Sequence, residues 1–174
     1  ALAVYTRAVV EAGRLSGTVP LTLDGGPTLA TPDDYAALRC LEALVDDAQV
    51  TLVEAVGSAY HPEQGGRVSA LTGIPTVLAW EGHERQWRGV TYDQVAGTRA
   101  QDVQRLYGDP TWMPAEEVIY RYGIDYVFVG AAERRAFDPF GLEKFAANLT
   151  LVCQSGDSLV YQTMADAGYN SIWQ

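Results

Sequence analysis

A single glycine joins a helix directly to an apolar strand, and this step constrains the fold more than any other feature of the sequence. Residues 114–122 have the pattern of a short helix, Gly123 suits a left-handed cap, and Ile124 can close back on the last turn. The next run, residues 126–130 (YVFVG), is typical of a central strand. A helix that leads through a glycine into such a strand is the product of an α/β unit with a parallel sheet. The sequence therefore predicts an α/β fold.

Further helices and strands are predicted on both sides of this step. Thr31 suits the N-cap of a helix, and Pro32 suits its first turn. Two more helices are expected over 91–107, with Tyr92, Val95, Arg99, Val103 and Leu106 facing inward, and over 132–148, interrupted near Asp138. Strands are expected over 50–56, 76–80, 149–154 and 159–162. The predicted architecture is a mixed, mostly parallel sheet flanked by helices, Rossmann-like in outline, with a C-terminal antiparallel hairpin.

The 174 residues are enough for one ordinary domain. We expect a core over 21–163, a lead-in over 1–20 and a tail over 164–174. No apolar run approaches the roughly 20 residues that cross a bilayer, so these residues are not expected to span a membrane. The first residue is Ala1 and not methionine, a start that fits either a trimmed chain or a piece of a longer protein.

The charge of the chain argues against nucleic acid as a partner. There are 22 acidic and 12 basic side chains, and the formal net charge is −10. A phosphate backbone would be repelled on average.

Two cysteines make neither a metal site nor a disulfide framework. Cys40 falls on a predicted helix and Cys153 in a predicted strand, both in apolar surroundings. We expect two buried free thiols, with a single disulfide as the alternative.

The unusual side chains gather in the loops that follow the first two predicted strands. Ligands of open α/β sheets bind outside the carboxyl ends of the strands, so a site is expected here. The segment 80–88 (WEGHERQWR), read as a loop, is the expected functional surface. The candidate binding residues are Glu54, Tyr60, Arg67, Trp80, His83, Glu84, Trp87 and Arg88.

These residue types suit the recognition of sugars and anions. Trp80 and Trp87 offer flat faces for stacking on sugar rings. Glu84 can accept hydroxyl hydrogens, and Arg67 or Arg88 can hold a phosphate or carboxylate. A structural alternative stays open: Glu84 and Arg88 have the i, i+4 spacing of a simple salt bridge, and the tryptophans can plug the sheet against the next helix.

Other chemistries have weaker signals. Glu81, His83 and Glu84 are metal-ligand types, but HERQW lacks the second histidine of an HExxH helix. No GxSxG elbow and no phosphate loop of the GxGxxG or GxxxxGK[ST] type occurs. We expect no cofactor in this domain.

An ordered set of motifs resembles a known family. The set comprises LDG at 23–25, EAVGSAY at 54–60, GRVSALTGIPTVLAWEGHERQWRG at 66–89 and YGIDYVFVGAAER at 122–134. It is similar to the C-terminal soluble part of the YYY-type membrane proteins, large polytopic proteins of unknown function. The resemblance covers roughly residues 20 to 163.

That family is similar in layout to type C glycosyltransferases, which use lipid-linked sugar donors. The resemblance implies an extracytoplasmic domain of a protein in the cell membrane, with its own membrane domain as partner. It also implies a lipid-linked sugar or a glycan acceptor as ligand, and a catalytic acid, with any divalent metal, in the absent membrane part. The segment 80–88 would be comparable in place to the Trp-rich recognition motif of oligosaccharyltransferase.

Three functional hypotheses follow. The first is a recognition domain of a membrane glycosyltransferase, without turnover on its own. The second is a non-enzymatic carbohydrate-binding or assembly module of a membrane protein. The third is a metal-dependent hydrolase with an ion at His83.

Overall fold

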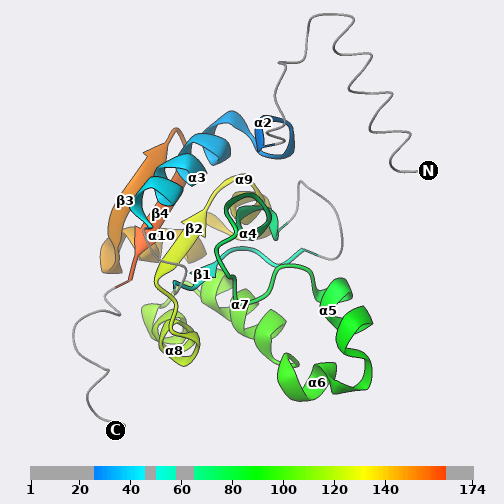
Figure 1. Cartoon of the computed structure of the whole chain (residues 1–174). Coiled ribbons are helices and arrows are strands. Elements are labelled where there is room, and N and C mark those ends of the chain that lie inside the picture. The colour runs from blue at the N-terminus through cyan, green and yellow to red at the C-terminus, as the bar shows by residue number, and fades with distance from the viewer. Residues whose placement is uncertain (1–25, 46–49, 58–64, 164–174) are drawn as a thin grey trace, which may run out of the picture.

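The computed structural model describes residues 26–45, 50–57 and 65–163, and Figure 1 shows their arrangement. Helices and strands are interspersed along these residues, which is an α/β fold. In chain order the elements are α2 (Gly26–Leu29), α3 (Pro32–Leu44), β1 (Leu52–Val53), α4 (Arg67–Thr72), α5 (Glu81–Arg88), the 3-10 helix η1 (Gly89–Thr91), α6 (Tyr92–Val95), α7 (Arg99–Gly108), α8 (Trp112–Tyr122), β2 (Tyr126–Val129), α9 (Ala131–Ala136), α10 (Pro139–Asn148), β3 (Thr150–Ser155) and β4 (Ser158–Gln162). None of the described helices is long and apolar enough to cross a membrane.

The four strands form one mixed sheet in the order β1-β2-β4-β3. β1 runs parallel to β2, whereas β4 is antiparallel to both β2 and β3. The predicted α/β class, the mixed sheet and the C-terminal hairpin are therefore confirmed. The predicted predominance of parallel strands is not what these residues form, because antiparallel pairs outnumber the parallel one in this small sheet.

The first two predicted strands are shorter than expected. β1 covers only two residues of the predicted 50–56, and residues 76–80 form isolated parallel bridges in place of a strand, Leu52 with Thr76 and Gly57 with Trp80. The ladder is interrupted beyond β1, where the Ala55 N–H donates to the Glu133 carboxylate at 2.8 Å. The Glu133 carboxylate thus accepts the hydrogen bond that a backbone carbonyl of a neighbouring strand would otherwise accept.

Both faces of the central strand β2 are buried, and helices cover the sheet on two sides, which makes a three-layer structure (Figure 1). Along β2, Tyr126 and Phe128 point to the layer of α3 and α4, while Val127 and Val129 point to the layer of α7, α8 and α10. Successive strand residues face opposite sides, so a strand covered on both faces must be apolar at every position. This explains the continuous apolar run that predicted a central strand.

The structure confirms the predicted capping residues at the ends of the helices. The Thr31 side chain accepts a hydrogen bond from the Asp34 N–H, and Pro32 occupies the first turn of α3. α8 ends at Gly123, which has φ of 57°, and the Ile124 N–H closes back on the Ile119 carbonyl at 3.0 Å. Asp138 caps α10 at the predicted interruption.

Two helical predictions were wrong in detail. The helix expected over 91–107 is divided into η1, α6 and α7, with Gly97 between α6 and α7, where a glycine weakens helical continuity. Val95, predicted to face inward, is 49% exposed. The segment 80–88, read as a loop, is mostly the helix α5.

The expectation of two free thiols was also wrong, because Cys40 and Cys153 form a disulfide. It joins α3 to β3 across 113 residues, with the Cα atoms 6.0 Å apart. The prediction that Cys40 lies in a helix and Cys153 in a strand was right. The residues around them, however, do not indicate that α3 packs on β3. The bond therefore fastens one helical layer to the C-terminal hairpin.

Breaking this disulfide should destabilise the domain. A cross-link that closes a long loop restricts the unfolded chain, and its loss costs roughly 2 to 5 kcal/mol. Urea unfolding with and without dithiothreitol should show this loss as a lower midpoint. The Cys40→Ala/Cys153→Ala double variant is the control, since its midpoint should not respond to reductant. An unchanged midpoint for the reduced natural protein would contradict the expectation.

Candidate functional site

The predicted binding residues fall into two separate places. Glu54 and Arg67 lie in the interior, both less than 5% exposed. The others that the structure describes belong to a surface segment made of α5 and the residue before it: Trp80, His83, Glu84, Trp87 and Arg88. Tyr60 and its neighbour His61 lie outside the described residues. The sequence thus predicted one site where the structure has two.

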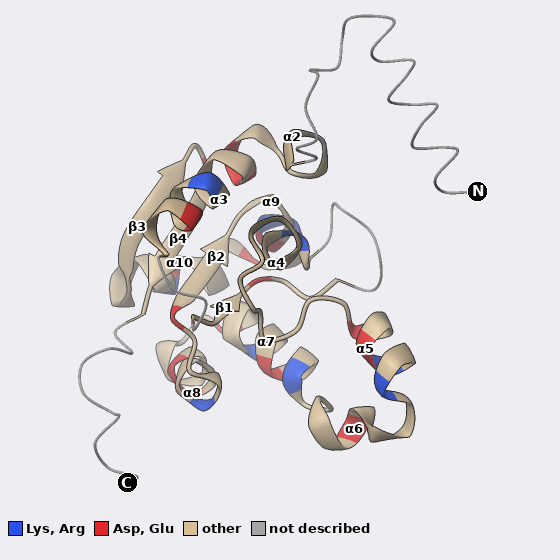
Figure 2. Ribbon diagram, in the orientation of Figure 1, with Lys and Arg blue, Asp and Glu red and all other residues tan. Residues whose placement is uncertain are grey.

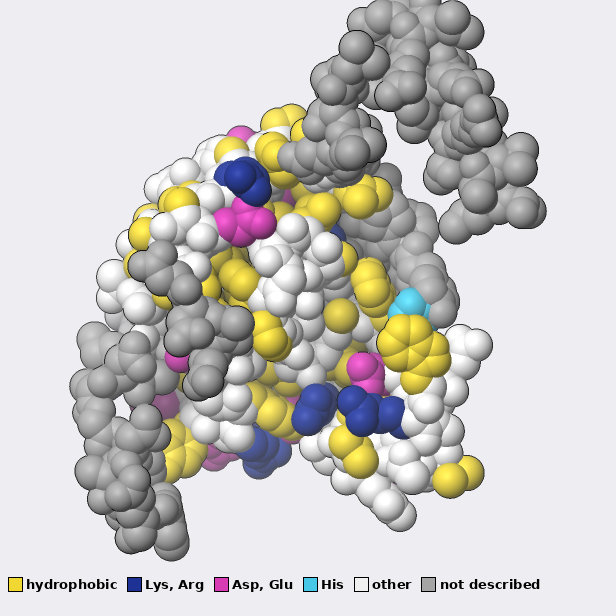
Figure 3. All heavy atoms as spheres, in the orientation of Figure 1, with side chains coloured by type: hydrophobic (Ala, Val, Ile, Leu, Met, Phe, Trp, Pro, Cys, Tyr) yellow, Lys and Arg dark blue, Asp and Glu magenta, His cyan; other side chains and the backbone are white. Residues whose placement is uncertain are grey.

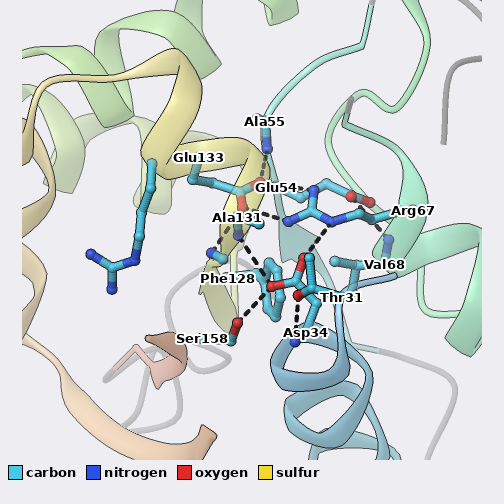
Figure 4. Close-up of polar contacts among 12 residues, drawn as sticks. Thr31, Asp34, Glu54, Ala55, Arg67, Val68, Phe128, Ala131, Glu133 and Ser158 are labelled. Atoms are coloured by element: carbon cyan, nitrogen blue, oxygen red, sulfur yellow. Dashed lines mark hydrogen bonds and ion pairs between the residues drawn. The ribbon is translucent and has the colours of Figure 1, made fainter. Parts of the chain in front are cut away.

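The interior place is centred on Arg67, the first residue of α4 (Figure 4). Its Nε donates to the Asp34 carboxylate at 3.0 Å, and Nη2 donates to the Glu133 carboxylate at 2.8 Å. The guanidinium also lies 5.1 Å from the centre of the Phe128 ring. Each guanidinium nitrogen thus donates to a carboxylate of the protein, and the buried side chain is not open to a ligand phosphate.

Asp34 and Glu133 extend these contacts into neighbouring elements. Asp34 accepts from the Ser158 hydroxyl at 2.6 Å and from the Ala131 N–H at 3.1 Å. Glu133 accepts from the Gly130 N–H at 2.9 Å, in addition to Ala55. A Cβ at Gly130 would lie 2.3 Å from Asp34 Oδ1, so only glycine fits this approach. The two carboxylates therefore join the Arg67 guanidinium to α3, α9 and β4.

Glu54 caps the N-terminus of α4. Its two carboxylate oxygens accept the Val68 and Ser69 N–H groups, each at 3.0 Å, at the N-terminus of α4. The helix after the first strand is the element whose N-terminus binds the pyrophosphate in dinucleotide-binding folds. Here a carboxylate of the protein has taken those donors and would repel a phosphate. Glu54 is a buried helix cap.

Burial governs the electrostatics of this group. Loss of solvent raises the pKa of Glu54 from 4.5 to about 7, against the opposing pull of the Ser69 and Val68 N–H donors and of Arg67. Burial alone lowers the pKa of Arg67, but the Glu133 carboxylate outweighs it, and the net pKa is raised. Arg67 therefore carries its charge at every accessible pH, whereas Glu54 changes its charge near neutrality.

The second place is the outer surface of α5 (Figure 3). This helix contributes no buried residue, and Trp87 is 77% exposed. The Trp87 ring stacks on His83, with centroids 5.2 Å apart and planes 15° apart. α5 contacts η1 and α6 and lies away from the sheet in Figure 1. The two rings form a flat aromatic platform on a projecting lobe.

Trp80 differs from Trp87, because it is half-buried and packs against the turn before α4. A Cβ at Gly66 would lie 2.7 Å from the Trp80 indole, and Gly66 also has φ of 86°, which favours glycine. The expectation that the tryptophans plug the structure thus fits Trp80, and stacking on a ligand fits only Trp87.

The charged residues of α5 form local pairs, and Figure 2 shows acidic and basic positions side by side on this helix. Arg88 pairs with Glu84, as the i, i+4 spacing predicted. Arg85 pairs with Glu81 at 3.0 Å and lies 4.2 Å from the centre of the Tyr92 ring. These exposed pairs orient the side chains but add little stability. Among residues 26–45, 50–57 and 65–163, no three metal-ligand side chains gather at one point.

Sequence reasoning missed two members of the interior group, although signals existed for both. Asp34 precedes Leu38 and Leu41 at i, i+4 and i+7, which places it on the buried face of α3. Glu133 stands at the third position of α9 directly after a buried strand, where a carboxylate can accept from the backbone of the helix start. Only the tertiary structure shows that both carboxylates pair with Arg67.

No protein-family model matches this chain, and the searches of curated proteins and of solved structures found no match. The resemblance to the YYY-type membrane proteins therefore stays a prediction.

Loss of the Arg67 guanidinium should strongly destabilise the fold. Arg67→Met leaves Asp34 and Glu133 buried without their cation, which costs about 3 to 5 kcal/mol. Arg88→Met makes the same change at an exposed pair and should cost no more than about 1 kcal/mol. Urea unfolding of the two variants measures the difference. If Arg67→Met does not fold, adding Glu133→Gln should restore part of the stability; equal costs for Arg67→Met and Arg88→Met would disprove this role.

Titration of Glu54 should appear in the pH dependence of stability. Because its pKa is about 7 in the folded protein and 4.5 when unfolded, the folded state keeps the proton longer. The contribution of Glu54 to the free energy of unfolding is therefore stabilising at pH 4.5. It falls by about 3 kcal/mol as the pH rises to 7. The difference in unfolding free energy between the natural protein and Glu54→Gln isolates it. Parallel pH profiles for the two proteins would contradict the shifted pKa.

Proposed function

We propose that this chain is the extracytoplasmic recognition domain of a membrane-attached glycosyltransferase of the type C layout. In this proposal the domain binds a lipid-linked sugar or a glycan acceptor through the α5 surface. The parent protein lies in the cell membrane, and bond cleavage belongs to its membrane part, together with any divalent metal. The isolated domain holds no cofactor and does not turn over substrate.

The observation that carries the proposal is the exposure of Trp87. An indole that is 77% exposed and backed by a stacked imidazole presents a preformed flat face. Aromatic faces of this kind stack on the apolar faces of sugar rings. The local Glu84–Arg88 pair supplies an acceptor and donors beside the platform. Glu54 and Arg67, in contrast, do not contribute to this surface, because the interior group holds them.

The disulfide supports the extracytoplasmic placement. Disulfides such as Cys40–Cys153 form and persist in oxidising compartments and are rare in the reducing cytosol. Folding outside the cytosol would therefore suit this domain. The motif resemblance over residues 20 to 163 leads to the same placement independently.

We further infer that the sheet is related to the Rossmann-like outline. Leu52 bridges Thr76 and also pairs with Tyr126, both in parallel, so residues 76–80, β1 and β2 follow a parallel order. A strand that lies between two later parallel neighbours is the switch-point arrangement of doubly wound sheets. The interior ion group occupies that point, and a ligand must then bind elsewhere.

A second candidate function is docking of the domain on its own membrane part without sugar recognition. The observation in its favour is Val90, which is 96% exposed in η1, next to the end of α5. Apolar side chains on a projecting lobe are typical of contact surfaces with another protein. Stacking on a sugar needs Trp87 alone, whereas protein docking needs Val90 as well.

Replacement of Trp87 tests the primary proposal. Trp87→Ala should lower the affinity of the isolated domain for a bound glycan by about tenfold or more, the loss typical of an exposed aromatic anchor. A glycan array followed by calorimetry measures it. Phe140→Ala is the matched control, since Phe140 is 71% exposed on α10.

The outcome also separates the two candidates. Glycan binding that survives Trp87→Ala would overturn the primary proposal. Docking is the function under two conditions. The natural domain binds no glycan, and Trp87→Ala and Val90→Ser both weaken the binding of the separate domain to the membrane part of the parent protein.

A further inference from the structure

We propose that the groove between α5 and α7 binds a short segment of neutral glycan. The inference rests on the proposed function, and it assigns the ligand class and a second contact surface. The residues that carry it are Glu81 and Arg85 of α5, and Gln101, Gln104 and Arg105 of α7. Glu81 and Arg85 lie in the segment 80–88 that the sequence predicted as the functional surface, whereas the three residues of α7 were not among the predicted binding residues.

The groove has the size of a small-molecule site. It is open and not enclosed, and its volume is about 700 Å³, compared with roughly 300 to 1,000 Å³ for small-molecule sites. Gly97 and Gly108 also stand along its lining. A disaccharide or trisaccharide can lie along it.

One wall is a row of polar side chains on α7. Gln101, Gln104 and Arg105 are exposed and follow the i, i+3, i+4 spacing of one helix face, while Val103 and Leu106 of the same helix are buried in the core. Each glutamine amide offers two donors and one acceptor oxygen. Vicinal hydroxyl groups of a sugar present the complementary set, since each is both donor and acceptor.

The opposite wall is held in place by ion pairs. Arg85 pairs with Glu81 at 3.0 Å and with Asp93 at 3.5 Å, and across the groove Arg105 pairs with Glu117 at 2.6 Å. The charge of each arginine is thus balanced by a neighbouring carboxylate. A groove with balanced charge and many hydrogen-bonding groups suits a neutral polyhydroxylated ligand better than a phosphate, which would have to displace the carboxylates.

The groove and the aromatic platform lie on different sides of α5. Glu81 and Arg85 share one face of the helix at i, i+4, and His83 and Trp87 share another. The second pair is offset from the first by two residues, so the two faces lie roughly 200° apart around the helix axis. The two surfaces can therefore be inactivated one at a time.

The experiment uses two variants of the isolated domain and two controls. Gln101→Ala/Gln104→Ala removes the amides, and Gln104→Trp fills the groove from an exposed position. Gln86→Ala/Gln94→Ala is the matched control, because both glutamines are exposed and neither lines the groove. Trp87→Ala reports on the aromatic platform. The probes are an array of neutral disaccharides and trisaccharides and, separately, inorganic phosphate, with side-chain amide NMR shifts as the site-specific readout.

We expect a neutral oligosaccharide to shift the Gln101 and Gln104 amide signals, and each groove variant to weaken its binding at least tenfold, with the control unchanged. Binding that is lost in Trp87→Ala but kept in both groove variants would overturn the groove and leave the proposed function standing. Binding lost only in the groove variants would support the groove and remove the Trp87 contact. Shifts with phosphate and none with any saccharide would overturn the groove assignment, and no binding by the natural domain would overturn both.

Discussion

The rest of the structure depends on the buried guanidinium of Arg67. A charge in the interior is costly unless it is paired and hydrogen-bonded, so the fold must bring carboxylates to it. Asp34 comes from α3 and Glu133 from α9, and both also accept backbone or hydroxyl donors. The helices α3, α4 and α9, which are distant in sequence, are thereby held together at one end of the sheet. The Cys40–Cys153 bond holds α3 to the hairpin by a second, covalent route.

This arrangement also decides where a ligand can bind. The side chains of Glu54, Arg67 and Glu133 are buried beyond the ends of the parallel strands, the place where open α/β sheets generally bind ligands. The N-terminal donors of α4 are already satisfied by a carboxylate. The recognition that we propose therefore lies at the periphery, where α5 exposes Trp87 on one side and faces the α7 groove on the other.

The predictions from sequence succeeded where a signal and its consequence lie within a few residues of each other. The cap at Thr31, the glycine at the end of α8 and the Glu84–Arg88 pair are of this kind. Predictions failed where the outcome depended on a distant partner. Glu54 and Arg67 were grouped with the surface residues because their loop follows a strand, but contacts with Val68, Asp34 and Glu133 bury them.

The segment 80–88 shows the same division. Its residue types alone determined that it would be polar, aromatic and locally paired, because spacing along one helix turn sets those contacts. Only the tertiary structure decided that it is a projecting helix, that Trp80 packs inward on Gly66 while Trp87 faces outward, and that Gln101 and Gln104 lie across from Arg85. The physical reason is that burial is a property of the surroundings: a side chain is covered or exposed by segments far away in the chain, and its own neighbours in sequence do not specify them.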